Sequence, residues 1–210
     1  MSLVNIIKLS ATPSTNTYLK DLAKTCFLKD YTVVVTSNQT KGRGQVDAQW
    51  HSQPNNSLIL SVFKRFEGLQ ISQQWYVSMA VSLAVFYTFK HLKIPEISIK
   101  WPNDIMSGNK KICGLLLENI FKGSLLNASI IGIGLNVNQE SFEKLPNAAS
   151  MFQISNKNFD LEEVLNVCLT FLNQKLKLLD QPEEYILKLY EGSLYRSDIA
   201  STFEADGQLF

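Results

Sequence analysis

Residues 112–118 read Ile-Cys-Gly-Leu-Leu-Leu-Glu, and residues 128–137 read Ala-Ser-Ile-Ile-Gly-Ile-Gly-Leu-Asn-Val. Both stretches consist mainly of β-branched and apolar residues, as buried strands do. The segment that joins them is short and partly polar, which leaves no room for a helical crossover. We therefore expect two strands of a mixed sheet rather than two strands of a doubly wound one.

The sequence before this pair contains three more strand-like runs, each bounded by Gly, Pro, Asn or Ser: Tyr31–Thr36, Ser57–Phe63 and Glu96–Lys100. Helical patterns lie between them, over Thr15–Cys26, which Ser14 could cap, and over Ser72–Leu92. Strands and helices do not alternate strictly. The predicted fold class is α+β, with a mixed, largely antiparallel sheet and helices packed on it.

The last third of the sequence is helical at first and strand-like at its end. Asp160 stands three residues before Glu163, as in a capping box, and apolar residues follow at helical spacing. Gln181-Pro182 ends this helix and Glu183–Tyr190 begins a shorter one. Residues 201–210 predict a strand, a turn at Asp206-Gly207 and the start of a return strand. The helical stripe, read as a core-facing side, is Leu165, Cys168, Leu169, Leu172, Leu176 and Leu179.

Composition excludes several classes of protein. The 210 residues carry 20 Lys and Arg against 19 Asp and Glu, a net charge of +1, which argues against a dedicated nucleic-acid binder. A hydrophobic fraction of 45% predicts a folded, soluble protein. No segment has the length of a membrane span or the order of a signal peptide. The three cysteines are odd in number and far apart, so we expect a reducing cytoplasm and no disulfide framework.

A glycine–arginine loop follows the predicted strand Tyr31–Thr36. It reads Asn38-Gln39-Thr40-Lys41-Gly42-Arg43-Gly44-Gln45. Two glycines let the backbone approach a ligand closely, and the guanidinium between them suits a phosphate or a carboxylate. The stretch matches neither a Walker loop nor the dinucleotide fingerprint. Taken alone, it fits a plain surface loop equally well.

A second polar cluster lies at the end of the strand that finishes at Lys100. The run Lys100-Trp101-Pro102-Asn103-Asp104 is followed closely by Lys110-Lys111-Ile112-Cys113-Gly114. Lysines, an amide and a carboxylate thus converge where sheets often place ligand-binding groups. A hairpin with solvated lysines is the alternative.

Two glycines inside a strand form the third signal, in the run Ile131–Asn138. They indicate a bulge or a close approach by a ligand or a backbone. The sequence shows no nucleophile beside a base, and neither His51 nor His91 has an evident partner. Acyl-enzyme hydrolysis and histidine-based metal chemistry are therefore disfavoured.

Taken in order, five motifs resemble the biotin protein ligase (biotin–acetyl-CoA-carboxylase ligase) family: residues 14–16 (Ser-Thr-Asn), 39–44 (Gln-Thr-Lys-Gly-Arg-Gly), 100–104 (Lys-Trp-Pro-Asn-Asp), 111–116 (Lys-Ile-Cys-Gly-Leu-Leu) and 134–138 (Gly-Leu-Asn-Val-Asn). The resemblance runs from about residue 5 to about residue 195. It implies a class II synthetase-like catalytic domain over residues 1–192, and the beginning of an incomplete SH3-like β domain over residues 193–210. It also implies the monofunctional type, without a DNA-binding domain.

The resemblance implies that biotin and Mg-ATP give biotinyl-5′-AMP, from which a lysine of the biotin carboxyl carrier protein of a carboxylase takes the biotinyl group. The implied catalytic residues are Lys111 and Arg43. Asp104 is the candidate for holding Mg²⁺. The implied biotin-binding residues are Ser14, Thr15, Asn16, Gln39, Gly42, Arg43, Lys111 and Gly114. The implied ATP-binding residues are Arg43, Gly44, Gln45, Trp50, Lys100, Asn103, Asp104, Lys111 and Asn136.

The chain departs from the family pattern after the glycine–arginine loop. The family often continues with further arginines, whereas Gln45, Val46, Asp47 and Ala48 stand here. Lipoate or octanoate ligases of the same fold, and a non-catalytic biotin- or carrier-binding module, are the alternative functions. No partner nucleic acid or membrane is expected, and the sequence leaves a homodimer open.

Overall fold

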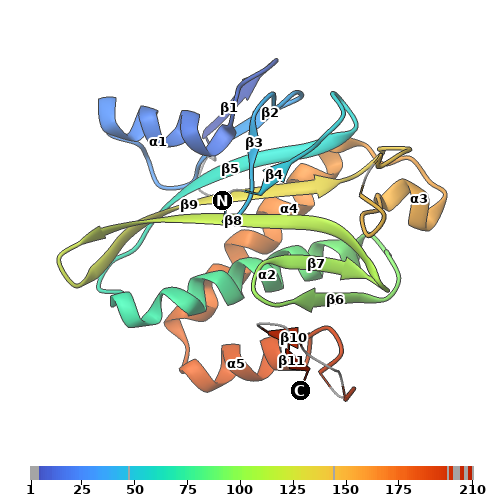
Figure 1. Ribbon diagram of the computed structural model, residues 1–210. Helices are drawn as coiled ribbons and strands as arrows, with labels where there is room; N and C mark the ends of the chain where they lie inside the picture. Colours follow the sequence, from blue (N-terminus) through green and yellow to red (C-terminus); the bar gives the residue numbers. More distant parts are fainter. Residues whose placement is uncertain are drawn as a thin grey trace.

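The computed structural model describes residues 5–46, 48–143, 145–197 and 199–200, and the backbone of 204–205 and 208–209. Seven strands form one sheet in the order β1-β2-β5-β9-β8-β7-β6 (Figure 1). Their bounds are β1 Asn5–Leu9, β2 Thr32–Thr36, β5 Ser57–Arg65, β6 Ile97–Lys100, β7 Asp104–Ser107, β8 Lys110–Lys122 and β9 Leu125–Asn136. A separate two-stranded hairpin joins β3 (Gly42–Arg43) to β4 (Gln49–Trp50).

The sheet is mixed and largely antiparallel, as the sequence predicts. Among the seven strands of this sheet only β1 and β2 pair in parallel. β8 and β9, which contain residues 112–118 and 128–136, form its longest antiparallel ladder, in which Gly114 lies opposite Gly134. Five strands were expected, and that number is wrong because β1 and β7 also belong to the sheet. β7 begins at Asp104, inside a run whose Pro, Asn and Asp indicate a turn, so its strand character is masked in the sequence.

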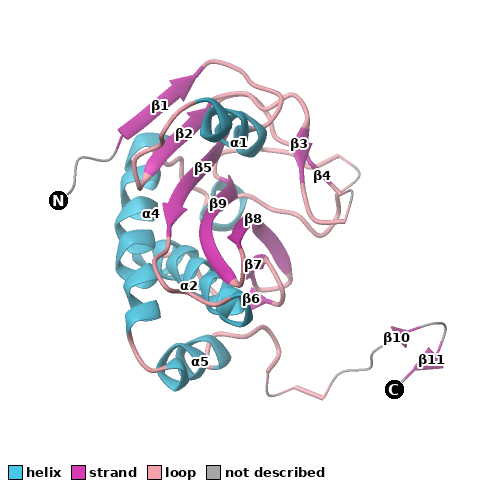
Figure 2. Cartoon of the chain, turned by 90° about the vertical axis from the view of Figure 1, so that its left-hand side faces the viewer, coloured by secondary structure: helices cyan, strands magenta, loops and turns pink. Residues whose placement is uncertain are grey.

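Helices cover both faces of the sheet. α2 (Gln74–His91) and α4 (Leu161–Leu176) pack on one face, and α1 (Thr15–Thr25) lies on the other together with the β3–β4 hairpin (Figure 2). Alternate residues of β8 therefore meet different surroundings. Cys113 and Leu115 belong to the large core under α2 and α4. A smaller core under α1 contains Leu19, Leu28, Val34, Phe63, Ala128 and Ile130.

The predicted helices are present, and their starts follow the capping chemistry of the sequence. Ser14 precedes α1 and its side chain accepts a hydrogen bond from the Thr17 amide, while Asp160 precedes α4 and accepts from the Glu162 amide. α4 turns its predicted apolar stripe to the core. After a 3₁₀ turn over Lys177–Asp180, the chain forms α5 (Glu183–Glu191). The sequence reading missed α3 (Met151–Ser155), which is too short to show a helical period.

The C-terminal prediction is only partly open to comparison. β10 (Glu204–Ala205) and β11 (Gln208–Leu209) pair in antiparallel fashion, as the hairpin prediction requires. Asp206 and Gly207, the predicted turn, lie outside the described residues. The division into a domain over 1–192 and an incomplete one over 193–210 stays a prediction. None of the helices in the described part of the chain combines the length and the hydropathy that a bilayer span requires.

Two adjacent leucines of β9 provide a test of the core. Leu126 is 1% exposed and Leu125 is 36% exposed. We expect Leu126→Ala to lower the free energy of unfolding by roughly 2–4 kcal/mol, because the substitution removes buried methyl groups and leaves a cavity. Leu125→Ala should cost less than about 1 kcal/mol. Urea unfolding of both variants measures this, and equal losses would contradict the packing described.

Candidate functional site

A β-bulge sets the position of Lys111. In the β7–β8 ladder Cys113 lies opposite Ile105 and Lys111 lies opposite Met106, so β8 carries one extra residue, Ile112. The bulge puts Lys111 on the same face as Gly114. A Cβ built on Gly114 would lie 3.4 Å from Cε of Lys111.

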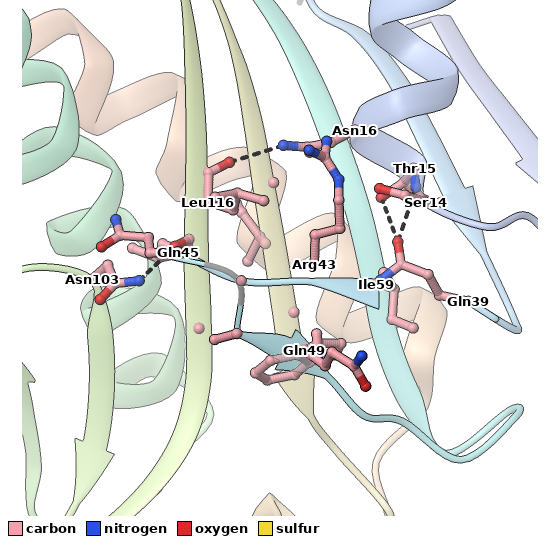
Figure 3. A pocket seen from close by; sticks show the side chains of 18 of the residues that line it. Ser14, Thr15, Asn16, Gln39, Arg43, Gln45, Gln49, Ile59, Asn103 and Leu116 are labelled. Atoms are coloured by element: carbon pink, nitrogen blue, oxygen red, sulfur yellow. Dashed lines mark hydrogen bonds between the residues drawn. The ribbon is translucent and has the colours of Figure 1, made fainter. Parts of the chain in front are cut away.

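This face of the sheet and the β3–β4 hairpin enclose a cavity of about 210 Å³ (Figure 3). Its walls come from the start of α1, the glycine–arginine loop, the β6–β7 turn, and strands β5, β8 and β9. Residues from all five sequence motifs therefore meet in one place, although they lie far apart in the chain. The predicted site residues that line this cavity are Ser14, Thr15, Asn16, Gln39, Arg43, Gly44, Gln45, Trp50, Asn103, Asp104, Lys111 and Gly114.

One end of the cavity is a connected set of buried polar side chains. Gln39 Oε1 accepts hydrogen bonds from the Thr15 amide (2.9 Å) and the Thr15 hydroxyl (3.3 Å). Ser61 Oγ lies 2.7 Å from Thr15 Oγ1 and donates to Asn16 Oδ1 at 2.6 Å. Thr15 and Asn16 are 3% exposed and Ser61 is fully buried. Such a set can hold a polar ligand group that a purely apolar pocket would leave unpaired.

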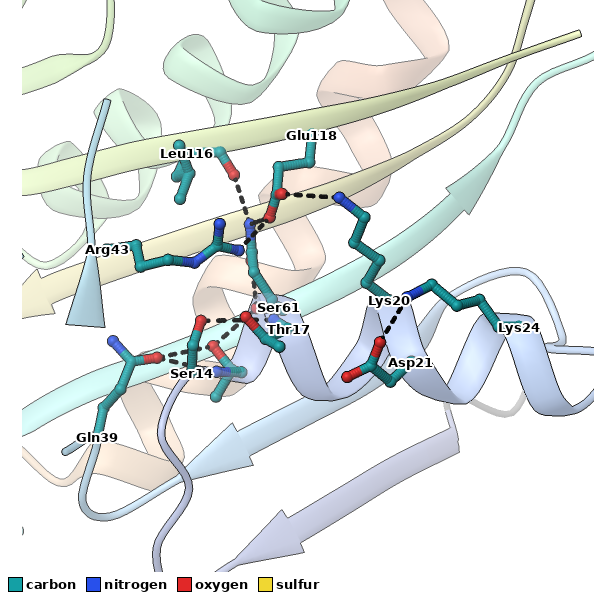
Figure 4. Close-up of polar contacts among 12 residues, drawn as sticks. Ser14, Thr17, Lys20, Asp21, Lys24, Gln39, Arg43, Ser61, Leu116 and Glu118 are labelled. Carbon is teal, nitrogen blue, oxygen red and sulfur yellow. Dashed lines mark hydrogen bonds and ion pairs between the residues drawn. The ribbon is translucent and has the colours of Figure 1, made fainter. Parts of the chain in front are cut away.

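Arg43 lies beside this polar end. Its Nη2 donates to Glu118 Oε2 at 2.7 Å, and the same carboxylate accepts from Asn16 Nδ2 at 2.9 Å and pairs with Lys20 Nζ at 3.3 Å (Figure 4). Burial opposes ionisation of Glu118. The hydrogen bond from Asn16 and the charges of Arg43 and Lys20 outweigh it, so the pKa of Glu118 is lowered.

Lys111 has a carboxylate partner of its own. Its Nζ lies 2.7 Å from Asp104 Oδ1, and both side chains are half-buried. The same ammonium lies 5.9 Å from the centre of the Trp50 ring. The indole covers Gly114 and Gly134, where a Cβ would come within 2.9 Å and 2.6 Å of its atoms. The glycines of β9 were predicted to allow the close approach of a ligand or a backbone; the structure instead shows side chains there, Trp50 at Gly134 and Asn16 at Gly132.

A second cavity of about 230 Å³ lies beyond Trp50 and Lys111, which line both cavities. The rest of its lining comes from Gln49, His51, Asn136 and the loop residues Phe142, Leu145, Pro146, Asn147 and Ala148. Asn136 Nδ2 donates to the Ala149 carbonyl at 3.0 Å, while its Oδ1 is buried without a hydrogen-bond partner among the described residues. The lining is mainly apolar, so this space suits a flat aromatic ring.

Three of the predicted site residues do not line the first cavity. Asn136 lines the second one, and Gly42 lies within β3 of the hairpin, where a Cβ would clash with the Trp50 carbonyl oxygen. Lys100 is exposed and lines neither cavity. The sequence reading missed Glu118 and Ser61. An even spacing from Gly114 to Glu118 on one strand is the signal that could have placed Glu118 on this face.

Metal ligands are sparse at this site. Within the part of the chain that the structure describes, no group of three His, Cys, Asp or Glu side chains could hold a metal ion. Asp104 supplies one carboxylate, and it already pairs with Lys111. A Mg²⁺ ion that arrives with nucleotide phosphates needs only one or two protein carboxylates, so a single aspartate fits that mode and does not fit an all-protein metal site.

The cysteines of β8 and α4 face away from the cavity. Burial raises the pKa of Cys168 to about 12 and raises that of Cys113 well above its usual value. Only Cys26 is exposed. We expect a thiol reagent such as Ellman's reagent to label one cysteine at pH 8 in the native protein and three after denaturation. Rapid labelling of Cys113 in the folded protein would contradict this placement.

The glycine floor makes a second prediction. Gly134→Ala puts a methyl group within 2.6 Å of the Trp50 indole, so the indole must move off the sheet. We expect the native fluorescence spectrum to shift to longer wavelength as Trp50 becomes hydrated. Gly192→Ala is the control, because its added Cβ would come no nearer than 3.4 Å to another atom and its φ of −67° suits alanine. A Gly134→Ala spectrum identical to that of the unmodified protein would place Trp50 elsewhere.

Comparisons with known proteins agree with this geometry. A model of the biotin/lipoate A/B protein ligase family matches residues 9–136. The bifunctional ligase/repressor BirA of Bacillus spizizenii is 33% identical over 139 residues, 64% of this chain and 42% of the relative. The biotin–[acetyl-CoA-carboxylase] ligase of Mycobacterium tuberculosis is 32% identical over 146 residues, 68% of this chain and 53% of the relative. The chain thus spans about half the length of these relatives.

A solved structure extends the similarity over most of the fold. The biotin protein ligase from Aquifex aeolicus in complex with biotin and ATP has a TM-score of 0.77 and 29% sequence identity, covering 90% of this chain and 78% of that one. The matched family region contains the polar end of the cavity, the glycine–arginine loop, Lys111 and the paired glycine strands. The chain belongs to the biotin/lipoate A/B protein ligase family.

Proposed function

We propose that this protein activates biotin with ATP to biotinyl-5′-AMP and transfers the biotinyl group to a lysine of the biotin carboxyl carrier protein of a carboxylase. One observation carries the proposal: Lys111 lies at the junction of two cavities, one ending in a polar pocket and the other suited to an aromatic ring. A carboxylic acid held in the first and a nucleotide held in the second would meet at this ammonium.

The polar pocket is the proposed site of the ureido ring of biotin. Thr15 bonds to Gln39, and Ser61 links Thr15 to Asn16, so these side chains have fixed directions before a ligand arrives. A ligand without matching polar groups would leave some of them buried and unpaired, at about 1–3 kcal/mol each. This is the basis of the proposed selectivity against other carboxylic acids.

In the proposed first step, a biotin carboxylate oxygen attacks the α-phosphorus of ATP and pyrophosphate leaves. Lys111 would hold the carboxylate and the α-phosphate together and neutralise the charge that develops. Asp104 holds the Lys111 ammonium in place at 2.7 Å. Gly44 and Gln45 would pass over the ligand on the hairpin, with Arg43 fixed beside the biotin end.

The nucleotide side is assigned to the second cavity. Trp50 would pack against adenine, and the buried, unpaired Oδ1 of Asn136 would accept a hydrogen bond from it. Asn103 and Asp104 lie where the phosphates would pass, and Asp104 offers the single carboxylate for magnesium that enters with ATP. Lys100 would act from the outer side of the same turn.

In the proposed second step, the amine of the carrier lysine attacks the acyl carbon of biotinyl-5′-AMP and AMP leaves. No covalent enzyme intermediate is needed, and the buried thiols of Cys113 and Cys168 face the other side of the sheet. A lipoate or octanoate ligase is the second candidate, since the family includes such enzymes. The polar pocket favours biotin, because the dithiolane ring of lipoate carries no hydrogen-bond donors.

Product analysis tests the proposal and separates these candidates. The protein is incubated with Mg-ATP and equimolar biotin and lipoate, without carrier, and the small-molecule products are identified by mass spectrometry. Biotinyl-5′-AMP is the expected product. Lipoyl-5′-AMP would move the assignment to the second candidate, and neither adenylate would leave a non-catalytic binding module.

Lys111→Gln tests the role of the central cation. We expect adenylate formation to fall at least about a hundredfold, because the developing charge loses its fixed counter-charge. The fold should persist, since the side chain is half-buried and lies at a cavity. Lys122→Gln is the matched control: this lysine is exposed at the other end of β8 and lines neither cavity. Equal activity of the two variants would remove Lys111 from the mechanism.

A further inference from the structure

We propose that Glu118 is a positioning residue for the ligand-covering hairpin: its carboxylate holds Arg43, and through Arg43 it keeps the β3–β4 hairpin closed over the cavity. Glu118 lines neither cavity, so it acts through other residues. The effect on turnover rests on the proposed function, whereas the effect on hairpin closure does not.

The hairpin has few attachments to the main sheet. Each of its strands is two residues long, and Val46 at its tip is 97% exposed. Trp50 fixes one strand by packing on the glycine floor. Arg43 fixes the other by its bond to Glu118 at 2.7 Å. A short isolated hairpin is marginally stable in water, so these two attachments determine whether it stays closed.

Glu118 is the fixed member of its pair. It lies on the long strand β8 with a side chain that is 19% exposed, whereas the Arg43 side chain on the hairpin is 45% exposed. Asn16 and Lys20 of α1 approach the same carboxylate from the other side. Asn16 Nδ2 also donates to the Leu116 carbonyl at 3.1 Å, which ties it to β8. Arg43 therefore takes its position from a rigid acceptor.

The pair also couples the hairpin to the polar pocket. A series of hydrogen bonds runs from Glu118 through Asn16, Ser61 and Thr15 to Gln39, which lies four residues before Arg43 (Figure 4). Both ends of the series thus return to the same segment of chain. A change at Glu118 should reach the pocket through Asn16 and the hairpin through Arg43.

Two features indicate that Glu118 acts through Arg43 rather than through Lys20. Lys20 is more exposed and its distance to the carboxylate is longer, 3.3 Å, so it contributes less to holding Glu118. The charge-assisted bond from Arg43 is the shortest contact of the carboxylate, and it is the one that crosses from the sheet to the hairpin.

Limited trypsin digestion tests closure without any ligand. Lys41 lies at the base of the hairpin, and the chain around it must open before trypsin can cut there. We expect Glu118→Gln to raise the rate of cleavage after Lys41 roughly five- to tenfold. Glu163→Gln is the matched control, since Glu163 is an exposed carboxylate on α4. Cleavage of Glu118→Gln at the rate of the control would overturn the proposal.

A double-variant cycle identifies the partner through which Glu118 acts. Arg43→Gln should raise cleavage after Lys41 by a similar factor, and the double variant Glu118→Gln/Arg43→Gln should add little to either change. If the increases in cleavage rate of the two single variants multiply in the double variant, Glu118 does not act through Arg43, and the assignment of Arg43 as its partner is overturned. Thermal unfolding of every variant is followed, so that a loss of the whole fold is recognised. If Glu118→Gln does not fold, Glu118→Asp takes its place, with a smaller increase expected.

Kinetics add the functional consequence. In adenylate formation, Glu118→Gln should raise KM for biotin more than it lowers kcat, because the opened hairpin holds the ligand less well while Lys111 stays in place. A fall in kcat alone would contradict a positioning role. If the unmodified protein forms no adenylate, the proposed function fails. The digestion result still stands in that case, so the two failures are distinguishable.

Discussion

The pairing of Gly114 with Gly134 is the constraint on which the site depends. Gly114 and Gly134 face each other on adjacent strands and, with Gly132 on the same face, leave a patch of backbone that carries no side chains. The indole of Trp50 lies directly on this patch. The position of Trp50 in turn sets the hairpin, and the hairpin closes the cavity in front of Lys111. A methyl group at Gly114 or Gly134 would push the Trp50 indole, and with it the β3–β4 hairpin, away from the sheet.

Charge is balanced in pairs throughout the site. Arg43 faces Glu118 and Lys111 faces Asp104, each at 2.7 Å. An ammonium or guanidinium left alone in a half-buried cavity would pay a desolvation cost and draw in solvent ions. The carboxylates remove that cost and fix the direction of each cation. An anionic ligand at Lys111 then competes with Asp104 for the ammonium. The affinity for the anion therefore depends on whether the ammonium can contact Asp104 and the ligand at the same time.

Much of the fold could be predicted from the sequence because the periodic signals are strong. The apolar runs of β5, β8 and β9 are long enough to indicate buried strands, and the apolar stripe of α4 is long enough to indicate a helix with one buried face. β7 escaped prediction because its run contains turn-forming residues, β1 because Asn5 and Lys8 interrupt its apolar run, and α3 because five residues are too few to show a helical period. The site residues were predicted because five motifs resemble a known family in their order and spacing. Glu118 and Ser61 lie within ordinary strands, and only the three-dimensional register shows that they face Arg43 and Asn16.

The extra residue of β8 gives Lys111 a role before any ligand is bound. Ile112 and Cys113 both lie in the core, so a β8 paired without the bulge would exchange the surroundings of Ile112 and Lys111. That pairing would bury an ammonium under α2 and expose an isoleucine in the cavity, and both changes are unfavourable. The lysine to which we assign the central role in the proposed reaction thereby also favours the correct strand register as the chain folds.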